Sequence, residues 1–563
     1  MSAAESFGEV FREMNRWGFE PVAVEPPGRA WKGTIRCRDV SILIELHVTD
    51  WQFIQYPKIS VLSAFNDSRL RPHLSTQRTL CYFQEGAVVL DMHRPAVALA
   101  QCLAQAQSVL SRLLFDTDSM RADLLEEFET YWLQETQEHS RVLLASVPSK
   151  PASGFWRTTF WTLEYADGSL CILSDNPAEV SKISHSFGAS KFRDTKAPCW
   201  LFSTAASPAI PEKLPSTVKE LFSWLRLWDA ELYRHFQDLL GHEVDYIKFQ
   251  RASFAITSPA GWLGFSFNID VPQSKIAKRS VRLYRNFLHN GGKDTPIFKF
   301  SVYDLSSNFL HSRNLTYRSL AGLRVKLIGC GAIGSFASEA LVRLGAGSSG
   351  GQLDLIDPGV LLPENLGRHI LGFSDLFEPK AIRLARHLEE KFPLSRILPH
   401  LSSALVLEDV FEADVLVDAA GEEAVSTALN SLHMRQAQDV PMVHVWILGN
   451  GEAVQALWVG GSKFACYRCL RILGPDGVLR DRFEVLKTET VRRQIGCHAF
   501  TPYAVSSPLH AAGLATAMIS DWLKRSEPSP RFRTIAADGA EARVVKNKNV
   551  LRLEGCPACS DAN

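Results

Sequence analysis

Two pairs of cysteines near the C-terminal end of the chain have a spacing that suits metal binding. Two residues separate the members of each pair, which are Cys466 with Cys469 and Cys556 with Cys559. Four thiolates form a tetrahedral ligand set that Zn²⁺ prefers, and a full set leaves no position open for catalysis. We therefore predict a structural zinc site that ties the C-terminal tail to the preceding domain. Two redox motifs are the alternative.

A glycine-rich segment, GCGAIG at 329–334, has the pattern of a phosphate-binding loop. It lies between a run typical of a buried strand and a run typical of a helix, where Gly329, Gly331 and Gly334 permit a tight turn and close approach of backbone to phosphate. Asp357 ends the next expected strand, at a position where an acid can bind ribose hydroxyls. The segment predicts nucleotide binding, and a purely structural turn is the alternative.

Three polar side chains beyond that second strand favour ATP over a nicotinamide cofactor. Asn365, Arg368 and Lys380 supply an amide, a guanidinium and an ammonium. Attack of a carboxylate on the α-phosphate of ATP builds negative charge on phosphoryl oxygens, which such donors stabilise. A hydride-transfer site has little need for them. A zinc-containing nicotinamide dehydrogenase remains an alternative, and it predicts stabilisation by NAD instead of ATP.

Two further cysteines have surroundings that suit a nucleophile. Cys497 follows a glycine and precedes His498, between the two metal-binding pairs. Cys81 follows a polar loop that contains His73 and precedes Tyr82 and Phe83. A thiolate beside an imidazole can accept an acyl group from an adenylate or a thioester. For each of these cysteines the alternative is a buried thiol without a chemical role.

The elements that must position these residues divide the chain into three regions. Residues 1–120 show a helical pattern, strand-like runs and a second helix, which together indicate an α+β unit. The strand-like runs are at 31–36, 40–47 and 58–63, and the second helix begins at Pro95. Residues 121–300 are mixed α/β, with helices expected at 126–144 and 217–241 and strands at 159–164 and 168–173. No chemical motif occurs in this middle region, so we expect a linker or protein-contact domain.

The third region, 301–563, has the alternation of strands and helices that builds a Rossmann-like sheet. Strands are expected at 323–329, 352–357, 413–420 and 440–448. Helices follow the glycine-rich segment and Pro379. Strands alternating with helices over this length predict a mostly parallel sheet covered on both faces.

The motifs of the third region resemble the ThiF-type adenylation domain of ubiquitin-activating enzymes and their bacterial relatives in thiamin and molybdopterin synthesis. The resemblance implies Mg-ATP, with Asp357 on ribose, and with Asn365, Arg368 and Lys380 at the phosphates. It also implies a homodimer, in which Arg313 or Arg318 reaches the nucleotide, often of the partner. Members of this family carry the two-pair zinc site and an activating cysteine between the pairs, which corresponds to Cys497.

The expected magnesium site departs from that family. Its usual Asp-x-x-Asp arrangement becomes Asp418-Ala-Ala-Gly421, followed by Glu422 and Glu423. Magnesium needs one or two carboxylates together with phosphate oxygens, so Asp418 or one of the glutamates is expected to bind it.

The N-terminal plan of helix, strands, long loop, cysteine and helix resembles a ubiquitin-conjugating enzyme. The family's His-Pro-Asn element is replaced by Pro72-His73-Leu74, and the asparagine is missing. His73 is therefore the candidate for stabilising the oxyanion when an amine attacks the Cys81 thioester. A structural loop histidine is the alternative.

A conjugating domain fused to an activating domain resembles the fusion proteins of bacterial CBASS antiphage operons. The resemblance implies that a cGAS-like nucleotidyltransferase is adenylated at its C-terminus, captured on Cys497, passed to Cys81 and attached to a protein amine. The same chemistry on a ubiquitin-like protein is one alternative, and a sulfur-carrier adenylyltransferase or a nucleotide-binding scaffold are others.

Composition narrows the remaining classes. The 563 residues suggest three or four domains at about 150 residues each. Lysine plus arginine and aspartate plus glutamate are balanced at 61 each, so no global basic field attracts nucleic acid or an anionic membrane. No uninterrupted apolar run reaches the length of a spanning helix. The 11 cysteines lack the even spacing of a disulfide framework, so we expect a reducing, cytoplasmic setting.

Overall fold

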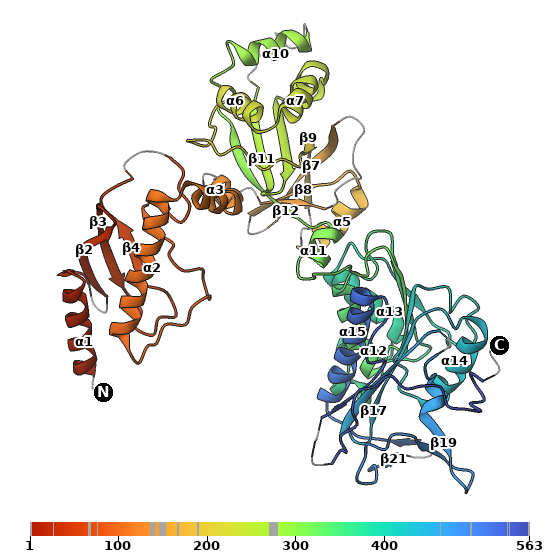
Figure 1. Cartoon of the computed structure of the whole chain (residues 1–563). Helices are drawn as coiled ribbons and strands as arrows, with labels where there is room; N and C mark the ends of the chain where they lie inside the picture. Colours follow the sequence, from red (N-terminus) through yellow and green to blue (C-terminus); the bar gives the residue numbers. More distant parts are fainter. Residues whose placement is uncertain are drawn as a thin grey trace.

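The computed structural model describes most of the chain. The described residues are 3–25, 28–65, 69–75, 77–134, 141–145, 154–165, 168–188, 191–269, 280–461, 463–495, 498–537, 539 and 541–560. Three bodies follow one another along the chain, with a β-barrel between an N-terminal α+β domain and a C-terminal α/β domain (Figure 1). Among the described residues, no helix is long and apolar enough to cross a membrane.

The N-terminal domain packs two helices on one face of an antiparallel sheet. The sheet runs in the order β1 (Glu20–Val22), β2 (Arg29–Cys37), β3 (Val40–Val48), β4 (Lys58–Val61) and β5 (Thr79–Leu80). Every second residue of β3 is buried, which is the period expected when one face of a strand is covered. Helices α1 (Ala3–Arg16) and α2 (Pro95–Phe115) cover that face. Pro95 occupies the first turn of α2, where its missing N–H leaves no hydrogen bond unmade.

The middle domain is built on a closed barrel, an architecture that the sequence analysis did not anticipate. The barrel strands, in spatial order, are β10 (Arg251–Ser258), β11 (Gly261–Asn268), β12 (Phe298–Asp304), β6 (Arg141–Leu144), β8 (Gly168–Leu173), β7 (Phe155–Tyr165) and β9 (Lys191–Ser203). Neighbouring residues of β10 point to opposite sides, so Ala255 belongs to one core cluster and Phe254 to another.

Helices flank the barrel, and most of them contribute residues to the second of these cores. They are α3 (Thr117–Glu126), α4 (Phe128–Gln134), α5 (Pro177–Ser186), α6 (Val218–Trp228), α7 (Ala230–His242), α8 (Asp245–Lys248), α10 (Val281–His289) and α11 (Ser307–Ser312). Phe128 and Trp132 of α4 stack on Trp224 of α6, and Trp132 also packs against Phe265 of β11. The α3 and α4 helices lead from the N-terminal domain into the barrel (Figure 1).

The C-terminal domain contains the expected mostly parallel sheet. Its order is β15 (Ile397–His400), β14 (Gln352–Ile356), β13 (Arg324–Ile328), β16 (Val415–Asp418), β17 (Met442–Leu448), β18 (Ala453–Val459) and β23 (Phe532–Ala536). The strands from β15 to β17 are parallel, and β18 and β23 add antiparallel pairs. Leu327 and Ile328 belong to different core clusters, so both faces of β13 are covered.

Helices cover the two faces of this sheet. On one face lie α12 (Ala332–Arg343), α13 (Lys380–Lys391) and α15 (Ser506–Arg525), and on the other lies α14 (Glu423–Gln436). The connections contain the 3₁₀ helices η1 (Pro363–Arg368), η2 (Phe373–Asp375) and η3 (Tyr467–Leu470). Two hairpins lie outside the sheet, β19 (Arg471–Leu473) with β20 (Leu479–Asp481) and β21 (Arg493–Ile495) with β22 (His498–Phe500).

Candidate functional sites: a phosphate loop, a cysteine cluster and an exposed thiol

The glycine-rich segment forms a turn from β13 into α12 at the carboxyl edge of the parallel strands. Gly329 has φ of +88°, and a Cβ there would lie 2.7 Å from the Ala420 backbone. A Cβ on Gly334 would collide with the Gly329 carbonyl oxygen. A Cβ on Gly331, the N-cap of α12, would have no protein atom within 4 Å. Gly331 thus faces open space at a helix N-terminus, which fits close approach of a phosphate.

Asp357 holds this turn together. Its carboxylate accepts hydrogen bonds from the Cys330 N–H at 2.7 Å and the Gly359 N–H at 2.6 Å. Lys380 begins α13, and its Nζ would lie 3.4 Å from a Cβ on Gly359. Within the described part of the chain, no carboxylate lies in ion-pair range of that ammonium, which fits a phosphate-binding role. Burial raises the pKa of the Cys330 thiol well above 9.0, so this cysteine is a space-filling residue and not a nucleophile.

His369 is a further residue of this site to which the sequence analysis assigned no role. Its Nε2–H donates to the Cys330 carbonyl oxygen at 2.8 Å, and its Nδ1 accepts the Leu371 N–H at 3.1 Å. Burial lowers the pKa of His369, and the nearby Lys380 ammonium lowers it further, so the ring is neutral. His369 therefore braces the phosphate loop. It is the residue after Arg368, but no local pattern signals a contact 39 residues away in the sequence.

Asn365 and Arg368 lie on η1 and adopt different roles in the fold. Asn365 Oδ1 accepts the Leu362 N–H at 3.0 Å and so stabilises the start of η1. The Arg368 guanidinium lies 4.8 Å from the ring centroid of Tyr503. Tyr503 is only six residues beyond Cys497 in the sequence. Arg368 thus connects the expected phosphate side of the domain with the segment that carries the expected activating cysteine.

Cys497 itself lies outside the described residues. The described chain on either side forms β21 and β22, which pair antiparallel. Asn450, between β17 and β18, donates to the carbonyl oxygens of Val491 and Pro502 at 2.9 Å each and accepts the Val491 N–H at 2.7 Å. Both ends of the 491–502 segment are therefore tied to the sheet.

The geometry argues against Asp418 as a magnesium ligand. Asp418 ends β16 with its side chain 1% exposed, and its Oδ2 lies 2.7 Å from Nδ1 of His444. Its Oδ1 accepts the Ala420 N–H at 3.1 Å, so both oxygens already have partners. Glu423 pairs with Arg471 at 2.7 Å. Both glutamates are exposed, and of the two Glu422 is the one without an ion pair to Arg471.

Neither candidate arginine from the N-terminal side contacts the phosphate loop within the described residues. Arg313 follows α11, and its guanidinium lies 5.5 Å from the ring centroid of Phe309. Burial raises the pKa of the Glu129 carboxyl on α4, and the charge of Arg313 partly opposes that rise. Arg318 stacks on Trp522 of α15 at 4.9 Å. A role at the nucleotide of a partner subunit stays a prediction.

The four predicted metal-binding cysteines lie together and are buried. Their sulfur atoms are all within 4.8 Å of one another. The Sγ–Sγ distance is 3.8 Å from Cys466 to Cys469, 3.9 Å from Cys466 to Cys556 and 3.5 Å from Cys469 to Cys559. A tetrahedron with Zn–S bonds of about 2.3 Å has an edge of about 3.8 Å, so the cluster fits Zn²⁺. The residues are Cys466, Cys469, Cys556 and Cys559. A bound zinc ion would supply a structural cross-link, not catalysis.

Cys81 directly follows β5 and is exposed. Its Sγ lies 3.5 Å from the Phe83 carbonyl oxygen. It lines a groove of about 640 Å³ whose walls include Tyr56, Tyr82 and Phe83. The Phe83 ring packs 5.0 Å from Tyr82 and 5.2 Å from Tyr56, centroid to centroid. Among the described cysteines, Cys81 is the exposed one, so it is the thiol that a partner can reach.

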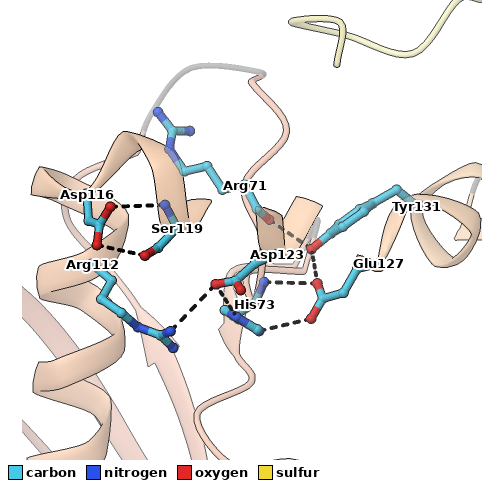
Figure 2. Close-up of polar contacts among 8 residues, drawn as sticks. All are labelled: Arg71, His73, Arg112, Asp116, Ser119, Asp123, Glu127 and Tyr131. Carbon is cyan, nitrogen blue, oxygen red and sulfur yellow. Dashed lines mark hydrogen bonds and ion pairs between the residues drawn. The ribbon is translucent and has the colours of Figure 1, made fainter. Parts of the chain in front are cut away.

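His73 lies beside this thiol, but its ring is held by carboxylates. The Cys81 N–H donates to the His73 carbonyl oxygen at 2.7 Å. The His73 ring nitrogens face Asp123, at 3.1 Å from Nε2, and Glu127, at 2.9 Å from Nδ1 (Figure 2). The nearby Cys81 thiolate and then Glu127 raise the pKa of His73 to about 10. Because both nitrogens are engaged, the geometry favours a loop-holding histidine over an oxyanion donor.

Two family models match the chain, in the order that the sequence predicts. The prokaryotic E2 family B model matches residues 30–141, and the ThiF family model matches residues 305–549. The chain therefore joins a ubiquitin-conjugating-like domain to a ubiquitin-activating-like domain, as a fused E1/E2-like enzyme does.

The full-length relatives carry the name "ATP-dependent ubiquitin transferase-like protein Cap2". The Pseudomonas aeruginosa (strain BWHPSA011 / Pa011) protein is 29% identical over 571 residues, covering 100% of both chains. The Vibrio cholerae serotype O1 (strain ATCC 39315 / El Tor Inaba N16961) protein is 24% identical, covering 88% of this chain and 87% of its own length. The solved structure "Crystal structure of E. coli MccB + ATP" covers 45% of this chain and 68% of that chain at 19% identity, with a TM-score of 0.32. A likeness that distant adds nothing to the assignment.

Proposed function

We propose that the chain activates the C-terminal carboxylate of a protein with ATP and conjugates it to an amine through two thioesters. The carboxylate attacks the α-phosphorus and pyrophosphate leaves. The Cys497 thiolate then attacks the acyl adenylate and AMP leaves, after which the Cys81 thiolate takes the acyl group and releases Cys497. An amine finally attacks the Cys81 thioester, which forms an amide and frees the thiol. The two thioesters divide one difficult acyl transfer into several easier steps.

The observation that carries this proposal is the exposed Cys81 thiol at the end of β5, in the same chain as an open phosphate loop. A sulfur-carrier adenylyltransferase would use the loop alone and would leave an exposed cysteine beside an aromatic groove without a role. The full-length relatives are named ATP-dependent ubiquitin transferase-like proteins, and this name supports a function that uses both the phosphate loop and the Cys81 thiol.

Residues of the adenylation domain have separate roles in this scheme. The backbone at Gly331 approaches the phosphates, while Lys380 and Arg368 neutralise charge that builds on the phosphoryl oxygens. Asp357 keeps the loop in place and lies where the ribose is expected. Mg²⁺ would supply positive charge at the phosphates, and the exposed Glu422 and Glu423 are the acids that could help to hold it.

For the cargo, we propose a cGAS-like nucleotidyltransferase, as in the CBASS operons whose fusion proteins this chain resembles. A ubiquitin-like protein is the second candidate, because the same chemistry accepts any accessible C-terminus. We also propose that the adenylation domains form a homodimer, in which Arg313 or Arg318 of one subunit reaches the nucleotide of the other.

Intact-mass spectrometry of the full chain with Mg-ATP and each candidate cargo tests the proposal. The expected product is an adduct of chain plus cargo, minus water, that a thiol reductant removes. Cys497→Ala should abolish both thioesters, whereas Cys81→Ala should leave an adduct on Cys497 and abolish amide formation. A nucleotide-binding scaffold predicts no adduct, and a sulfur-carrier adenylyltransferase predicts adenylate formation without a thioester on either cysteine.

A further inference from the structure

The loop ahead of Cys81, residues 69–75, is held by residues of the region that follows the N-terminal domain. The Leu70 N–H donates to the Glu212 carbonyl oxygen at 3.2 Å, and the Tyr131 hydroxyl donates to the Arg71 carbonyl oxygen at 2.9 Å. The His73 ring lies between Asp123 and Glu127 (Figure 2). The same loop bonds to the Cys81 backbone and forms a bridge from Leu74 to Leu80. The backbone of Cys81 and residues of the following region therefore bond to the same short loop.

Glu127 makes the densest set of these contacts. One of its oxygens lies 2.9 Å from His73 Nδ1, and the other accepts the His73 N–H at 3.3 Å and the Tyr131 hydroxyl at 2.8 Å. Asp123 lies one helical turn earlier on α3 and also faces Arg112 of α2, at 3.7 Å. The side chains of His73, Asp123 and Glu127 are 20%, 24% and 31% exposed, so water screens these ion pairs only in part.

The backbone at His73 supports a positioning role. Its φ of 60° lies in the left-handed region, which residues other than glycine rarely adopt. Such a conformation is strained and persists where the surroundings determine it. Three groups of His73 are fixed by contacts. The ring contacts Asp123 and Glu127, the N–H donates to Glu127, and the carbonyl oxygen accepts the Cys81 N–H.

We propose that Asp123 and Glu127 are positioning residues for acyl transfer at Cys81, which act through His73 by fixing the loop whose carbonyl oxygen holds the Cys81 backbone. The linker helix thereby completes the thiol site, in place of the missing asparagine element. The inference rests on the proposed function, because it assumes that Cys81 carries an acyl group.

The test uses the full chain and a synthetic acyl donor, N-acetylglycylglycine as the thioester of mercaptoethanesulfonate. The Cys81 thiolate attacks its carbonyl carbon, mercaptoethanesulfonate leaves as a thiolate, and added lysine then takes the acyl group as an amide and returns the proton to Cys81. Loading and discharge are followed by mass spectrometry of the Cys81 peptide. This donor bypasses ATP and Cys497, so it isolates the N-terminal site.

The variants are Asp123→Asn, Glu127→Gln and both together. Discharge at saturating lysine should fall about tenfold or more in the double variant, because small misplacement of reacting groups costs up to about a hundredfold. The lysine concentration for half-maximal rate should stay unchanged. The matched control is Asp116→Asn, which removes a carboxylate charge from the N-cap of the same helix without contacting His73. It should stay within about twofold of wild type, because asparagine also caps helices.

The pH profile separates positioning by a charged ring from a merely structural contact. Asp123 and Glu127 of α3, Tyr131 of α4, Arg112 of α2 and the thiol of Cys81 are the titratable or charged groups around His73. The Cys81 thiolate contributes most to the raised pKa of His73, and Glu127 and Asp123 raise it further. In the acylated enzyme the thiolate charge is absent, so the two carboxylates are the groups that keep the ring protonated. Without them the pKa of the ring should lie closer to its ordinary value of 6.5, so discharge by the double variant should show an added fall between about pH 6 and 8.

The outcomes are distinguishable. Wild-type discharge rates in the double variant, or an equal loss in Asp116→Asn, would overturn the inference while leaving the proposed function intact. A rate that falls by one factor at every pH would also overturn it, because helix damage alone would explain that result. If wild-type Cys81 accepts no acyl group from the donor, the proposed function fails and the inference fails with it.

Discussion

The three glycines of the phosphate loop differ in what an added methyl group would meet. At Gly331 the methyl group would point into open space, whereas at Gly334 it would meet the Gly329 carbonyl oxygen. Gly331→Ala should therefore leave the fold intact, with an apparent melting temperature within about 2 °C of wild type. Affinity for ATP should fall about tenfold or more, because the methyl group occupies the space that a phosphate needs. Titration calorimetry with ATP and a thermal melt measure both.

Gly334→Ala provides the contrast for that substitution. It should lower the melting temperature as well as ATP affinity, since the backbone of the loop must move. If Gly331→Ala bound ATP as tightly as wild type while remaining folded, the open space at the α12 N-terminus would not be the phosphate site.

Site residues could be predicted from the sequence where a motif places them only a few positions apart. The four clustered cysteines and the glycine-rich segment each carry their pattern within a few positions, and the structure brings their members together. The partners His369, His444, Asp123 and Glu127 escaped prediction, because each contact joins positions between 26 and 54 residues apart. Asp418 illustrates the same limit, since its burial depends on a histidine from the neighbouring strand.

Elements were predictable where periodicity is regular, and the failures have identifiable causes. The expected helix at 217–241 is two helices, because Asp229 accepts the N–H groups of Glu231 and Leu232 and starts a new helix. The expected helix at 126–144 was wrong at its end, where Arg141–Leu144 forms β6. That strand pairs with β12 and β8, which are remote in sequence, and non-local pairing overrides a local helical pattern.

The cysteine cluster makes a prediction about the C-terminal tail. Each chain should contain one Zn²⁺, measured by elemental analysis, and Cys556→Ser with Cys559→Ser should abolish it. The adenylation domain should then melt about 5 °C or more lower, because metal binding contributes folding free energy. Ser560→Ala is a matched control, since Ser560 contacts the Cys556 carbonyl oxygen and is not a ligand. Full thermal stability without metal would contradict a structural site.

The contact between loop and α3 makes a prediction about pH. The pKa of His73 is raised from 6.5 to about 10, so its contribution to stability is complete below about pH 6.5 and is lost as pH rises towards 10. Burial acts to raise the pKa of Glu127, but hydrogen bonds from His73 and Tyr131 lower it below 4.5, so its contribution is lost in acid. Hydrogen exchange of residues 69–81 should therefore be faster in His73→Gln than in wild type at pH 6, with the difference shrinking towards pH 10. A difference that does not change with pH would show that the ring's charge is irrelevant.

At the scale of the whole molecule, the barrel separates the two domains that carry chemistry (Figure 1). It also contacts the adenylation domain, where the Ser186 hydroxyl donates to the Glu390 carbonyl oxygen at 3.3 Å. An apolar cavity of about 340 Å³ lies at this junction and is lined by Ile183, Phe187, Leu305, Leu310 and Phe392. The middle domain is therefore more than a flexible tether, since it contacts the Cys81 loop on one side and the adenylation domain on the other.

This arrangement predicts that acyl transfer from Cys497 to Cys81 occurs within one chain and not between chains. A tether that holds donor and acceptor together raises their effective concentration to about the millimolar range. The rate of conjugation per wild-type chain should therefore stay constant between nanomolar and micromolar enzyme, in a single-turnover assay with cargo and Mg-ATP. In a mixture of Cys81→Ala and Cys497→Ala chains, the rate of conjugation per chain should rise in proportion to enzyme concentration, because transfer then requires two chains to meet. If the mixture reached half of the wild-type rate at nanomolar enzyme, the thioester would instead cross between the subunits of a stable dimer, and the barrel would serve to present Cys81 to its partner.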